Sequence, residues 1–519
     1  MFKDLREFIA TLEDLDHVRT LHGVDWDLEI GALTEMAAEA GLHNHPALFF
    51  DAIKGYPKGY RVLTNILTTV PRCAIALGLP HDTLGLEVLR HWKDMCGNWQ
   101  PIPCRTVSDG PVLENIRRGP DVDIEIFPTP RWHELDPGRF IGTGNMVVMK
   151  DPDGDWINVA AQRNVIYEKD TLGILSMPGK HPYLFTQRHH ARGESVPVAI
   201  CFGQEPATWI PAGMFLPYGR SEYDLAGALR GAPVEVIRGE VTGLPFPATA
   251  EIVIEGEITP RSVEERIEGP FGEYTGYYGA GPALQPVVKI KALYYRNDPI
   301  LFGVPPIRPP FGPYTGVPFP AGDTWDALEK AGVPDVVGVW QPLSRLLTVV
   351  AIRQRYAGHA KQALLVAAGS RGTAYVTKYV IVVDDDIDVT NLDEVMWAVV
   401  TRTNPDAAID IVRDTWSSSI DPALHADERL KAAHGTQKNS KALINACRPY
   451  AWREEFPAVN RVSDSLRKSM RAKFAQFLAE VEGARRPLGG RAGGRGPGAG
   501  AGEGVPGGPR REGHFQDGM

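Results

Sequence analysis

Two glutamates flank a short turn in the segment Glu268-Gly269-Pro270-Phe271-Gly272-Glu273. The Gly-Pro pair favours a turn and Gly272 lets the backbone approach a ligand, so a rigid loop can hold both carboxylates near each other. Close carboxylates raise the pKa of one of them, which keeps a proton donor available near neutral pH. The alternative is a solvated turn with two surface glutamates.

A predicted β-hairpin carries the next set of candidate residues. Its first strand runs from Asn145 to Lys150, its turn is Asp151-Pro152-Asp153-Gly154, and its second strand reaches Arg163. Because a strand alternates faces, we expect Asn158 and Gln162 on one side and Arg163 on the other. Arg163 would either form an ion pair that tunes a catalytic carboxylate or lie on the outer face of the sheet.

Asn158, His181 and Glu222 together supply oxygen, nitrogen and oxygen donors. This set suits Mn²⁺ or Mg²⁺ better than zinc. Glu222 is also the first residue of a predicted helix, and Ser221 before it is a residue type common at the N-cap. In that position, the carboxylate of Glu222 could serve only to complement the helix dipole. The spacing of the three residues does not establish that they converge.

An acidic run, Asp384-Asp385-Asp386, follows the predicted strand from Tyr379 to Val383. We interpret it as a solvated cap of the next turn rather than a metal site. The sequence has no Gly-x-Gly-x-x-Gly after a strand, no Walker loop and no Gly-x-Ser-x-Gly elbow. Nicotinamide, P-loop and serine-hydrolase chemistry therefore lose their main support.

The chain as a whole is acidic, with 55 Lys and Arg against 64 Asp and Glu and a net charge of -9. Such a balance does not provide an extended surface for DNA or RNA phosphates. Five cysteines without a Cys-x-x-Cys pair predict neither a disulfide framework nor structural zinc. No apolar run approaches the roughly 18 residues of a membrane span. The first residues lack a signal-peptide pattern, so we expect a cytoplasmic protein without membrane association.

The elements that position these residues divide the 519-residue chain into about three domains. Residues 1–105 mix helical patterns, at 2–12 and 27–40, with short apolar runs, which predicts an N-terminal α/β domain. Residues 106–300 alternate short strands with Gly, Pro and Asp turns, which predicts a β-rich domain folded as a barrel. Its further strands are expected at 196–202, 234–238, 250–258 and 287–295.

Beyond a linker at residues 301–325, helical and β-branched segments alternate over residues 326–483. This order predicts a C-terminal α/β domain with a mostly parallel sheet and a last helix from Ser463 to Glu482. Residues 484–519 are rich in Gly, Arg and Pro and should be disordered.

In this order, the segments resemble the UbiD-like family of decarboxylases, which use prenylated flavin mononucleotide (FMN). The resemblance covers roughly residues 1 to 470, and its blocks are DWINVAAQR, MPGKHP, GRSEYDLAGAL, FPATAEIVIEG, IEGPFGEYTGYY, YAGHAK and YVIVVDDDIDV. It implies an N-terminal α/β domain, a central split β-barrel of the flavin-reductase type that holds the cofactor, and a C-terminal α/β domain used for oligomerisation.

The resemblance also implies the residues of the site. The catalytic set falls on Arg163, Glu268 and Glu273, and the metal ligands fall on Asn158, His181 and Glu222, with the cofactor phosphate completing the shell around Mn²⁺ or Mg²⁺. A neighbouring K⁺ would lie near Ala212, Met214 and Glu222. The cofactor-binding residues implied are Asn158, Gln162, Arg163, Ala212, Gly213, Met214, Glu222 and Lys361, the last as a phosphate contact.

The implied reaction is a reversible, non-oxidative decarboxylation in which the flavin is the electron sink and Glu273 delivers a proton. We expect an aromatic or heteroaromatic acid rather than a short α,β-unsaturated one, with Met177, Lys180, Tyr274 and residues 302–306 as its wall. Carboxylation of a phenolic or heteroaromatic compound is the alternative within the family. A flavin prenyltransferase would supply the cofactor, and we expect a homodimer or a higher homo-oligomer.

A hypothesis of another class is nucleic-acid binding through the tail, where Arg491, Arg495, Arg510 and Arg511 stand among glycines. The tail has almost no aromatic residues and also carries Glu503, Glu512 and Asp517. We therefore interpret it as a solubilising extension and expect no nucleic-acid partner.

Overall fold

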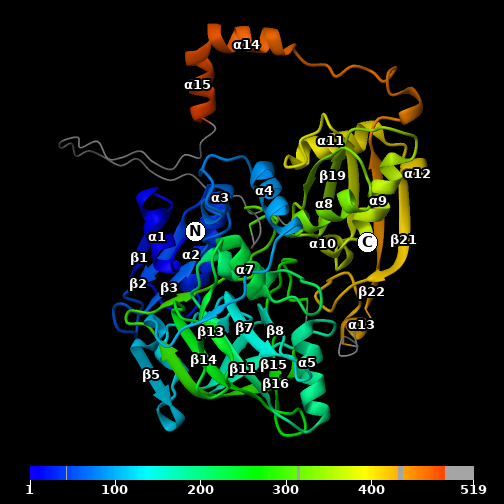
Figure 1. Cartoon of the computed structure of the whole chain (residues 1–519). Helices are drawn as coiled ribbons and strands as arrows, with labels where there is room; N and C mark the ends of the chain where they lie inside the picture. Colours follow the sequence, from blue (N-terminus) through cyan, green and yellow to red (C-terminus); the bar gives the residue numbers. More distant parts are fainter. Residues whose placement is uncertain (42–43, 280, 312–315, 431–436, 485–519) are drawn as a thin grey trace, which may run out of the picture. The chain divides into compact units, whose positions relative to one another are not determined.

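The computed structural model describes residues 1–41, 44–279, 281–311, 316–430 and 437–484 (Figure 1). The chain falls into two compact units, Met1–Ala458 and Val459–Met519. Within the described part, no helix is long and apolar enough to cross a membrane. The predicted disordered tail lies, apart from Ala484, outside the described residues.

The first sheet has four strands in the order β1-β2-β3-β17. Pairs β1–β2 and β3–β17 are parallel and β2–β3 is antiparallel. The fourth strand, β17, lies at residues 300–302. The sequence predicted the end of the barrel and the start of a linker there, whereas the chain returns to the N-terminal sheet. The elements are α1 (Leu5–Asp14), β1 (Val18–His22), α2 (Glu29–Gly41), β2 (Ala47–Asp51), β3 (Arg61–Thr64), α3 (Val70–Ala76), α4 (Gly85–Gly97) and β17 (Ile300–Phe302).

Helix α1 shows why this N-terminal segment folds as predicted. The side chain of Asp4 accepts a hydrogen bond from the backbone N–H of Glu7 and caps the first turn. One face of the helix is apolar at helical spacing and is buried against the first sheet, and its buried residues are Leu5, Phe8, Ile9 and Leu12.

The second sheet is antiparallel and has ten strands, with the path β6-β9-β10-β16-β14-β11-β7-β8 and with β5 and β15 paired to β16. The predicted hairpin is confirmed, because Met149 of β7 pairs with Asn158 of β8. In Figure 1 these strands run in cyan and green. Their bounds are β5 (Asn115–Arg118), β6 (Phe140–Gly142), β7 (Asn145–Lys150), β8 (Ile157–Ala160), β9 (Asn164–Glu168), β10 (Thr171–Ile174), β11 (Val196–Phe202), β14 (Ile252–Ile258), β15 (Glu265–Glu268) and β16 (Ala283–Tyr295).

Three helices and a small sheet accompany the ten-stranded sheet. Helix α5 contacts β7 and β8, and α7 contacts β8 and the 3₁₀ turn Ile210–Gly213, so the first residues of both helices lie near the hairpin. The elements are α5 (His181–Ala191), α6 (Pro206–Trp209), α7 (Glu222–Arg230), and the strands β4 (Arg105–Thr106), β12 (Glu235–Arg238) and β13 (Pro245–Pro247). Further 3₁₀ turns lie at Pro111–Glu114, Gly119–Asp121, Ile124–Ile126 and Tyr450–Trp452.

The third large sheet has the order β18-β19-β20-β22-β21. Its three central strands are parallel, but both outer pairs are antiparallel, so the prediction of a mostly parallel sheet holds only for the centre. The elements are α8 (Pro320–Lys330), β18 (Val336–Trp340), β19 (Leu347–Ile352), α9 (His359–Gly369), α10 (Arg371–Ala374), β20 (Tyr379–Asp384), α11 (Leu392–Arg402), α12 (Pro405–Ala408), β21 (Ile409–Trp416), α13 (Ala426–Leu430) and β22 (Lys438–Ala446).

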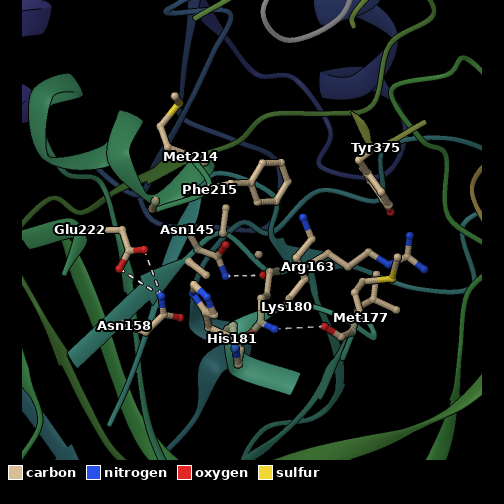
Figure 2. A pocket seen from close by; sticks show the side chains of 18 of the residues that line it. Asn145, Asn158, Arg163, Met177, Lys180, His181, Met214, Phe215, Glu222 and Tyr375 are labelled. Atoms are coloured by element: carbon tan, nitrogen blue, oxygen red, sulfur yellow. Dashed lines mark hydrogen bonds between the residues drawn. The ribbon is translucent and has the colours of Figure 1, made fainter. Parts of the chain in front are cut away.

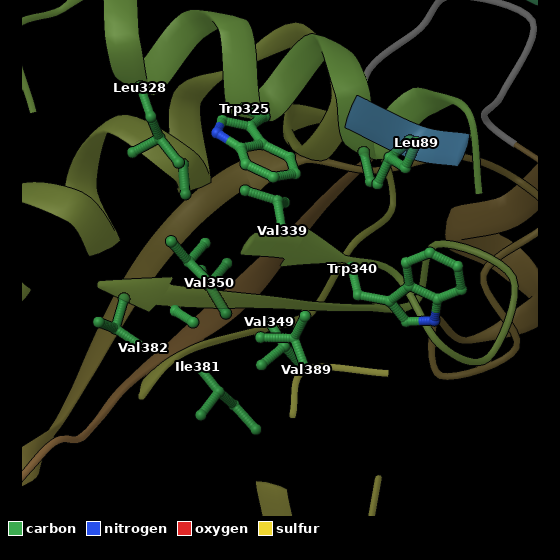
Figure 3. Close-up of a cluster of buried hydrophobic side chains, with 14 of the residues drawn as sticks. Leu89, Trp325, Leu328, Val339, Trp340, Val349, Val350, Ile381, Val382 and Val389 are labelled. Carbon is green, nitrogen blue, oxygen red and sulfur yellow. The ribbon is translucent and has the colours of Figure 1, made fainter. Parts of the chain in front are cut away.

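The core of this sheet is built from β-branched strand residues and helix α8. Figure 3 shows Trp325 and Leu328 directed from α8 toward Val339 and Val350 of the sheet. The same buried cluster includes Leu89 of α4 and Leu225 of α7. Burial of such side chains stabilises the fold by roughly 1.5 to 3 kcal/mol each. One apolar core therefore joins elements of all three sheet regions.

The described part of the second unit, up to Ala484, contains two helices, α14 (Asp464–Lys473) and α15 (Ala475–Ala484). The prediction of one continuous helix from Ser463 to Glu482 is wrong, because Phe474 leaves the helical conformation with φ -121° and ψ 33°. The predicted start is confirmed, since the side chain of Ser463 caps α14 by accepting from the backbone N–H of Leu466.

Candidate active site

Arg163 joins the two glutamates of the Glu-Gly-Pro-Phe-Gly-Glu turn. Its Nε and Nη2 donate to the two carboxylate oxygens of Glu268 at 2.7 and 2.8 Å, and its Nη1 donates to Oε1 of Glu273 at 2.7 Å. The side chains of all three are buried or nearly so, with exposed fractions of 8%, 2% and 15%. The ring of Phe271 lies under the guanidinium, 5.3 Å from its carbon. The two carboxylates are therefore held together rather than solvated.

The geometry corrects the expected orientation of Arg163. Strand β8 ends at Ala160, so the alternation predicted through Arg163 stops before it. Asn158, Gln162 and Arg163 consequently line the same cavity. Glu268 is the last residue of β15, and the backbone N–H of Glu273 donates to the carbonyl of Tyr277, which closes the loop that follows Glu273.

The electrostatics of this triad favour a protonatable Glu273. Burial raises the pKa of Glu273 to about 7, the positive charge of Arg163 opposes that shift, and the charge of Glu268 adds to it. Burial alone would lower the pKa of the Arg163 guanidinium. The negative charges of Glu268 and Glu273 have the larger effect, so the pKa of Arg163 is raised. Glu273 is thus the carboxyl group of the pair that can carry a proton near neutral pH.

The second cluster centres on the carboxylate of Glu222, the first residue of α7. Asn158 donates from Nδ2 to its two oxygens at 3.0 and 3.1 Å, and the backbone N–H of Val159 donates at 2.7 Å. Ser221 occupies the N-cap position, but its side chain makes no capping hydrogen bond. Burial raises the pKa of Glu222 to about 8, although the N–H donors oppose the shift. Glu222 does more than complement the helix dipole.

His181 begins α5 and lines the same cavity. Its ring centroid lies 4.9 Å from that of Trp156 and 5.9 Å from that of Tyr218. Burial lowers its pKa, and the charges of Lys180 and Arg371 lower it further, so the imidazole favours the neutral form that a metal ion binds. Within the described residues, no three His, Cys, Asp or Glu side chains gather around one point.

A cavity of about 590 Å³ connects both clusters (Figure 2). The predicted site residues that line it are Asn158, Gln162, Arg163, His181, Ala212, Gly213, Met214, Glu222 and Glu273. From the predicted wall, Met177, Lys180, Tyr274, Val304 and Pro306 also line it. Glu268 lines an adjoining cavity that shares Arg163, Leu175 and Met177.

Lys361 is not brought to this cavity. It lies on α9, its side chain is 42% exposed, and its Nζ pairs with the carboxylate of Asp410. Burial beside Arg345 lowers the pKa of another lysine, Lys180, to about 7, and this side chain does line the cavity.

Several lining residues were not anticipated. Asn145, at the start of β7, donates from Nδ2 to the carbonyl of Gln162 and to Oδ1 of Asn164, both at 2.7 Å. Arg371, Tyr375 and Trp416 reach the cavity from the segments around the third sheet. Asn145 could have been noticed as a polar residue opening an apolar strand, whereas the other three carry no local motif.

Three buried side-chain oxygen atoms at the cavity have no hydrogen-bond partner among the described residues: Oδ1 of Asn145, Oδ1 of Asn158 and Oε1 of Gln162. Buried polar atoms in native proteins are nearly always satisfied, so these are oriented for a ligand or a cation. They belong to residues that line the same cavity as Glu222 and Arg163, and this cavity has the size of small-molecule sites.

Residues 9–92, 105–309 and 316–446 match the models of the N-terminal, Rift-related and C-terminal domains of 3-octaprenyl-4-hydroxybenzoate carboxy-lyase. The chain is 32% identical to a phenolic acid decarboxylase of Streptomyces sp. (strain D7), over 87% of this chain and 93% of the relative. It is 34% identical to pyrrole-2-carboxylic acid decarboxylase of Pseudomonas aeruginosa, over 86% and 91% of the two chains.

Solved structures give the same result. The UbiD-class enzyme HmfF from Pelotomaculum thermopropionicum, in complex with FMN, superposes with a TM-score of 0.78 at 30% identity, over 90% of this chain and 98% of that chain. An evolved dimeric form of that enzyme, in complex with prenylated FMN (prFMN), has a TM-score of 0.74 at 29% identity, over 89% and 97% of the chains. Nucleic-acid binding through the tail has no support in these comparisons. With three successive domain models matched and relatives aligned along most of both chains, this chain belongs to the UbiD family of carboxy-lyases.

Proposed function

We propose that the protein is a non-oxidative, reversible decarboxylase of an aromatic or heteroaromatic carboxylic acid. The single observation that carries this proposal is the pairing of Arg163 with both Glu268 and Glu273 at the wall of the cavity. This pairing leaves Glu273 as a carboxyl group that can be protonated and Glu268 as one that stays paired with Arg163. The curated relatives, which act on phenolic acids and pyrrole-2-carboxylate by their names, support this substrate class.

The roles of the residues follow from their contacts. Loss of CO₂ leaves a pair of electrons on an sp² carbon, and prenylated FMN, when bound, supplies the electron sink that side chains lack. Glu273 then acts as general acid and delivers its proton to the vacated carbon, since its pKa of about 7 provides both the acid and its conjugate base at neutral pH. Arg163 orients Glu273, and Glu268 holds Arg163 through two parallel hydrogen bonds.

The residues present fit such a cofactor with its metal ion. Among the described residues, Oδ1 of Asn158 and Oε1 of Gln162 are buried acceptors without a partner, and no cationic side chain forms an ion pair with the buried Glu222 carboxylate. Asn158, His181 and Glu222 would hold Mn²⁺ or Mg²⁺ near the cofactor phosphate, a donor set suited to these ions. Ala212 and Met214 would hold K⁺ through backbone carbonyls, and Gln162 and Gly213 would contact the cofactor.

The proposal extends to the reaction in the cell. A flavin prenyltransferase must supply the cofactor, and the third sheet region would carry the contacts of a homo-oligomer. The direction of the reaction depends on the CO₂ supply, so carboxylation of a phenolic or heteroaromatic compound is the second candidate. It uses the same cavity, with Glu273 accepting the proton instead of donating it.

The decisive experiment is anaerobic expression with and without a flavin prenyltransferase, followed by mass and absorbance measurements of the copurified small molecule. Prenylated FMN should appear only in the first sample, and that sample should release CO₂ from members of a panel of aromatic acids. If the folded protein binds Mn²⁺ but no flavin in either sample, the proposed function is wrong.

A further inference from the structure

Three cationic side chains lie around Phe215, which lines the cavity together with Lys180 and Arg371; Figure 2 labels Phe215 and Lys180. The third, Arg345, packs on Phe215 but is not one of the described residues that line the cavity. Nζ of Lys180 lies 3.2 Å from the centroid of this ring and 5.0 Å from that of Tyr375, and the guanidinium carbon of Arg345 lies 5.2 Å from the Phe215 centroid. Arg371 donates from Nη1 to the backbone carbonyl of Phe215 at 2.6 Å. Lys180, Arg345 and Arg371 are called the cation cluster below.

The cation cluster lacks anionic partners. Over the described ranges of the chain, none of its three members forms an ion pair with a carboxylate. Arg345 is only 8% exposed, and its Nε and Nη2 have no hydrogen-bond partner in the part of the chain that the structure describes. Asp323 is the acidic residue whose charge acts on Arg345 and Arg371, but it is not within ion-pair distance of either. A buried guanidinium with unpaired N–H groups is unfavourable unless an anion completes it.

The backbone that carries Arg345 is also strained. Leu343, Ser344 and Arg345 have φ of 56°, 52° and 74°, three successive non-glycine residues in the left-handed region between β18 and β19. Thr377 donates from Oγ1 to the carbonyl of Arg345 at 2.6 Å and holds this conformation. Such strain persists only where the surroundings over-determine it, and it gathers at ligand-binding segments. The fold therefore keeps Arg345 beside Lys180 and Phe215 against an unfavourable backbone conformation.

The Lys180 ammonium and the imidazole of His181, a proposed metal ligand, face different neighbours, although the two residues are adjacent and the charges of Lys180 and Arg371 act on that imidazole. The His181 ring faces Trp156 and Tyr218, whereas the Lys180 ammonium faces Phe215 and Tyr375. Phe215 and Tyr375 offer apolar ring faces beside the cations, a combination that suits a flat aromatic ring with a charged substituent.

We propose that the cation cluster binds a second anionic group of the substrate, so that the acid decarboxylated at the Arg163 triad is an aromatic dicarboxylic acid. This inference rests on the proposed function. One carboxylate lies at Glu273 and leaves as CO₂, and the other stays intact at Lys180, with Arg345 and Arg371 adding positive charge behind it. A site built with charged donors rejects a substrate that leaves those donors unpaired.

The test is equilibrium binding, measured by calorimetry on the cofactor-loaded protein, for benzoate, para-hydroxybenzoate, isophthalate and terephthalate. We expect at least one dicarboxylate to bind about tenfold or more tightly than benzoate, because charge-assisted hydrogen bonds replace unpaired N–H groups. Lys180→Met should remove most of this ratio and Lys180→Arg should keep it. Lys291→Met, at an exposed lysine of β16, is the matched control and should change nothing.

The outcomes separate this inference from the proposed function. Equal affinities of benzoate and both dicarboxylates in the unaltered protein would overturn it, and so would tighter binding of para-hydroxybenzoate than of either dicarboxylate. Loss of flavin absorbance in Lys180→Met would also overturn it and assign the cation cluster to the cofactor. If Lys180→Met does not fold, Arg371→Met replaces it, since that side chain is exposed and can be removed without burying a cavity. If no acid releases CO₂, the proposed function is contradicted. The ratio of dicarboxylate to benzoate affinity would still decide whether the cation cluster binds a second anionic group.

Discussion

Nη1 of Arg163 lies 2.7 Å from Oε1 of Glu273, while the other two donating nitrogens of the same guanidinium are committed to Glu268. Glu268 is thus fully paired, and Glu273 receives a single hydrogen bond from the arginine. Burial raises the pKa of Glu273 by more than the contact with Arg163 lowers it, so this pKa rises to about 7. The asymmetry assigns the two carboxylates different tasks.

Glu273→Gln should remove the proton donor without changing the shape of the cavity. We expect kcat to fall by about 10² to 10⁴-fold, the usual contribution of a general acid, while the flavin content of the purified protein stays unchanged. CO₂ release and flavin absorbance measure the two effects. Glu194→Gln, at an exposed glutamate, is the matched control. Turnover of Glu273→Gln at the rate of the control would exclude Glu273 as the donor.

Replacing Arg163 by Met leaves two buried carboxylates without their shared cation. Breaking a buried pair of this kind destabilises a protein by about 3 to 5 kcal/mol. Because the charge of Arg163 lowers the pKa of Glu273, its removal should move the pH profile of any remaining activity to higher pH. Urea unfolding and a pH–rate profile test both effects. A variant as stable as the parent would show that the triad contributes no net ion-pair energy.

The sequence predicted the parts of this site that depend on local chemistry. The turn residues Asp151 to Gly154 specified the β7–β8 hairpin, and the motif placed Glu268 and Glu273 close in sequence, but the hydrogen bonds that join their carboxylates come from Arg163. The convergence of Asn158, His181 and Glu222 came from the family resemblance, because the three residues lie on a strand and on two helix starts that only the packed fold brings together.

The acidic run shows why other contacts were missed. Asp384 was expected to be solvated, but it is only 3% exposed, and it accepts hydrogen bonds from Arg402 and from the backbone N–H of Arg448 at 3.0 and 2.7 Å. Both partners are distant in sequence from the acidic run, one on α11 and the other after β22. The same limit applies to Arg371 and Tyr375, which carry no motif and reach the cavity through the arrangement of the third sheet.

The raised pKa of Glu273 also predicts how the stability of the ligand-free protein depends on pH. In the unfolded chain this carboxyl titrates near 4.5 and in the folded protein near 7, so the folded state binds more protons between these values. The contribution of Glu273 to stability should therefore fall as pH rises from 4.5 to 7 and should stay constant above that. The full difference is about 3 kcal/mol at 1.36 kcal/mol per pKa unit.

The comparison of the parent with Glu273→Gln isolates this effect, because Glu222, whose pKa burial also raises, is the same in both proteins. Unfolding free energies measured in urea between pH 4 and pH 8 should show the variant gaining on the parent as pH rises. Parallel curves for the two proteins would mean that Glu273 titrates at the same pH in the folded and unfolded states.

Glu222→Gln tests the proposed metal site. It keeps the size of the side chain and an oxygen for the hydrogen bonds from Asn158 and Val159, but it removes the charge that a divalent cation needs. We expect the affinity for Mn²⁺, measured by calorimetry, to fall by at least about tenfold, as loss of a charged partner of a metal does. Glu194→Gln, at an exposed glutamate paired with His189, removes a charge away from the cluster and should leave Mn²⁺ binding unchanged.

The stability of the same variant separates a metal ligand from a structural carboxylate. Without metal, burial holds the pKa of Glu222 near 8, so its ionised form is unfavourable and Gln should leave the metal-free protein at least as stable as the parent at pH 8. Added Mn²⁺ should raise the Tm of the parent and not that of the variant, because an ion that binds only the folded state stabilises it by mass action. If Glu222→Gln lowers the metal-free Tm and Mn²⁺ shifts both proteins equally, Glu222 holds the fold through Asn158 and Val159 and is not a metal ligand.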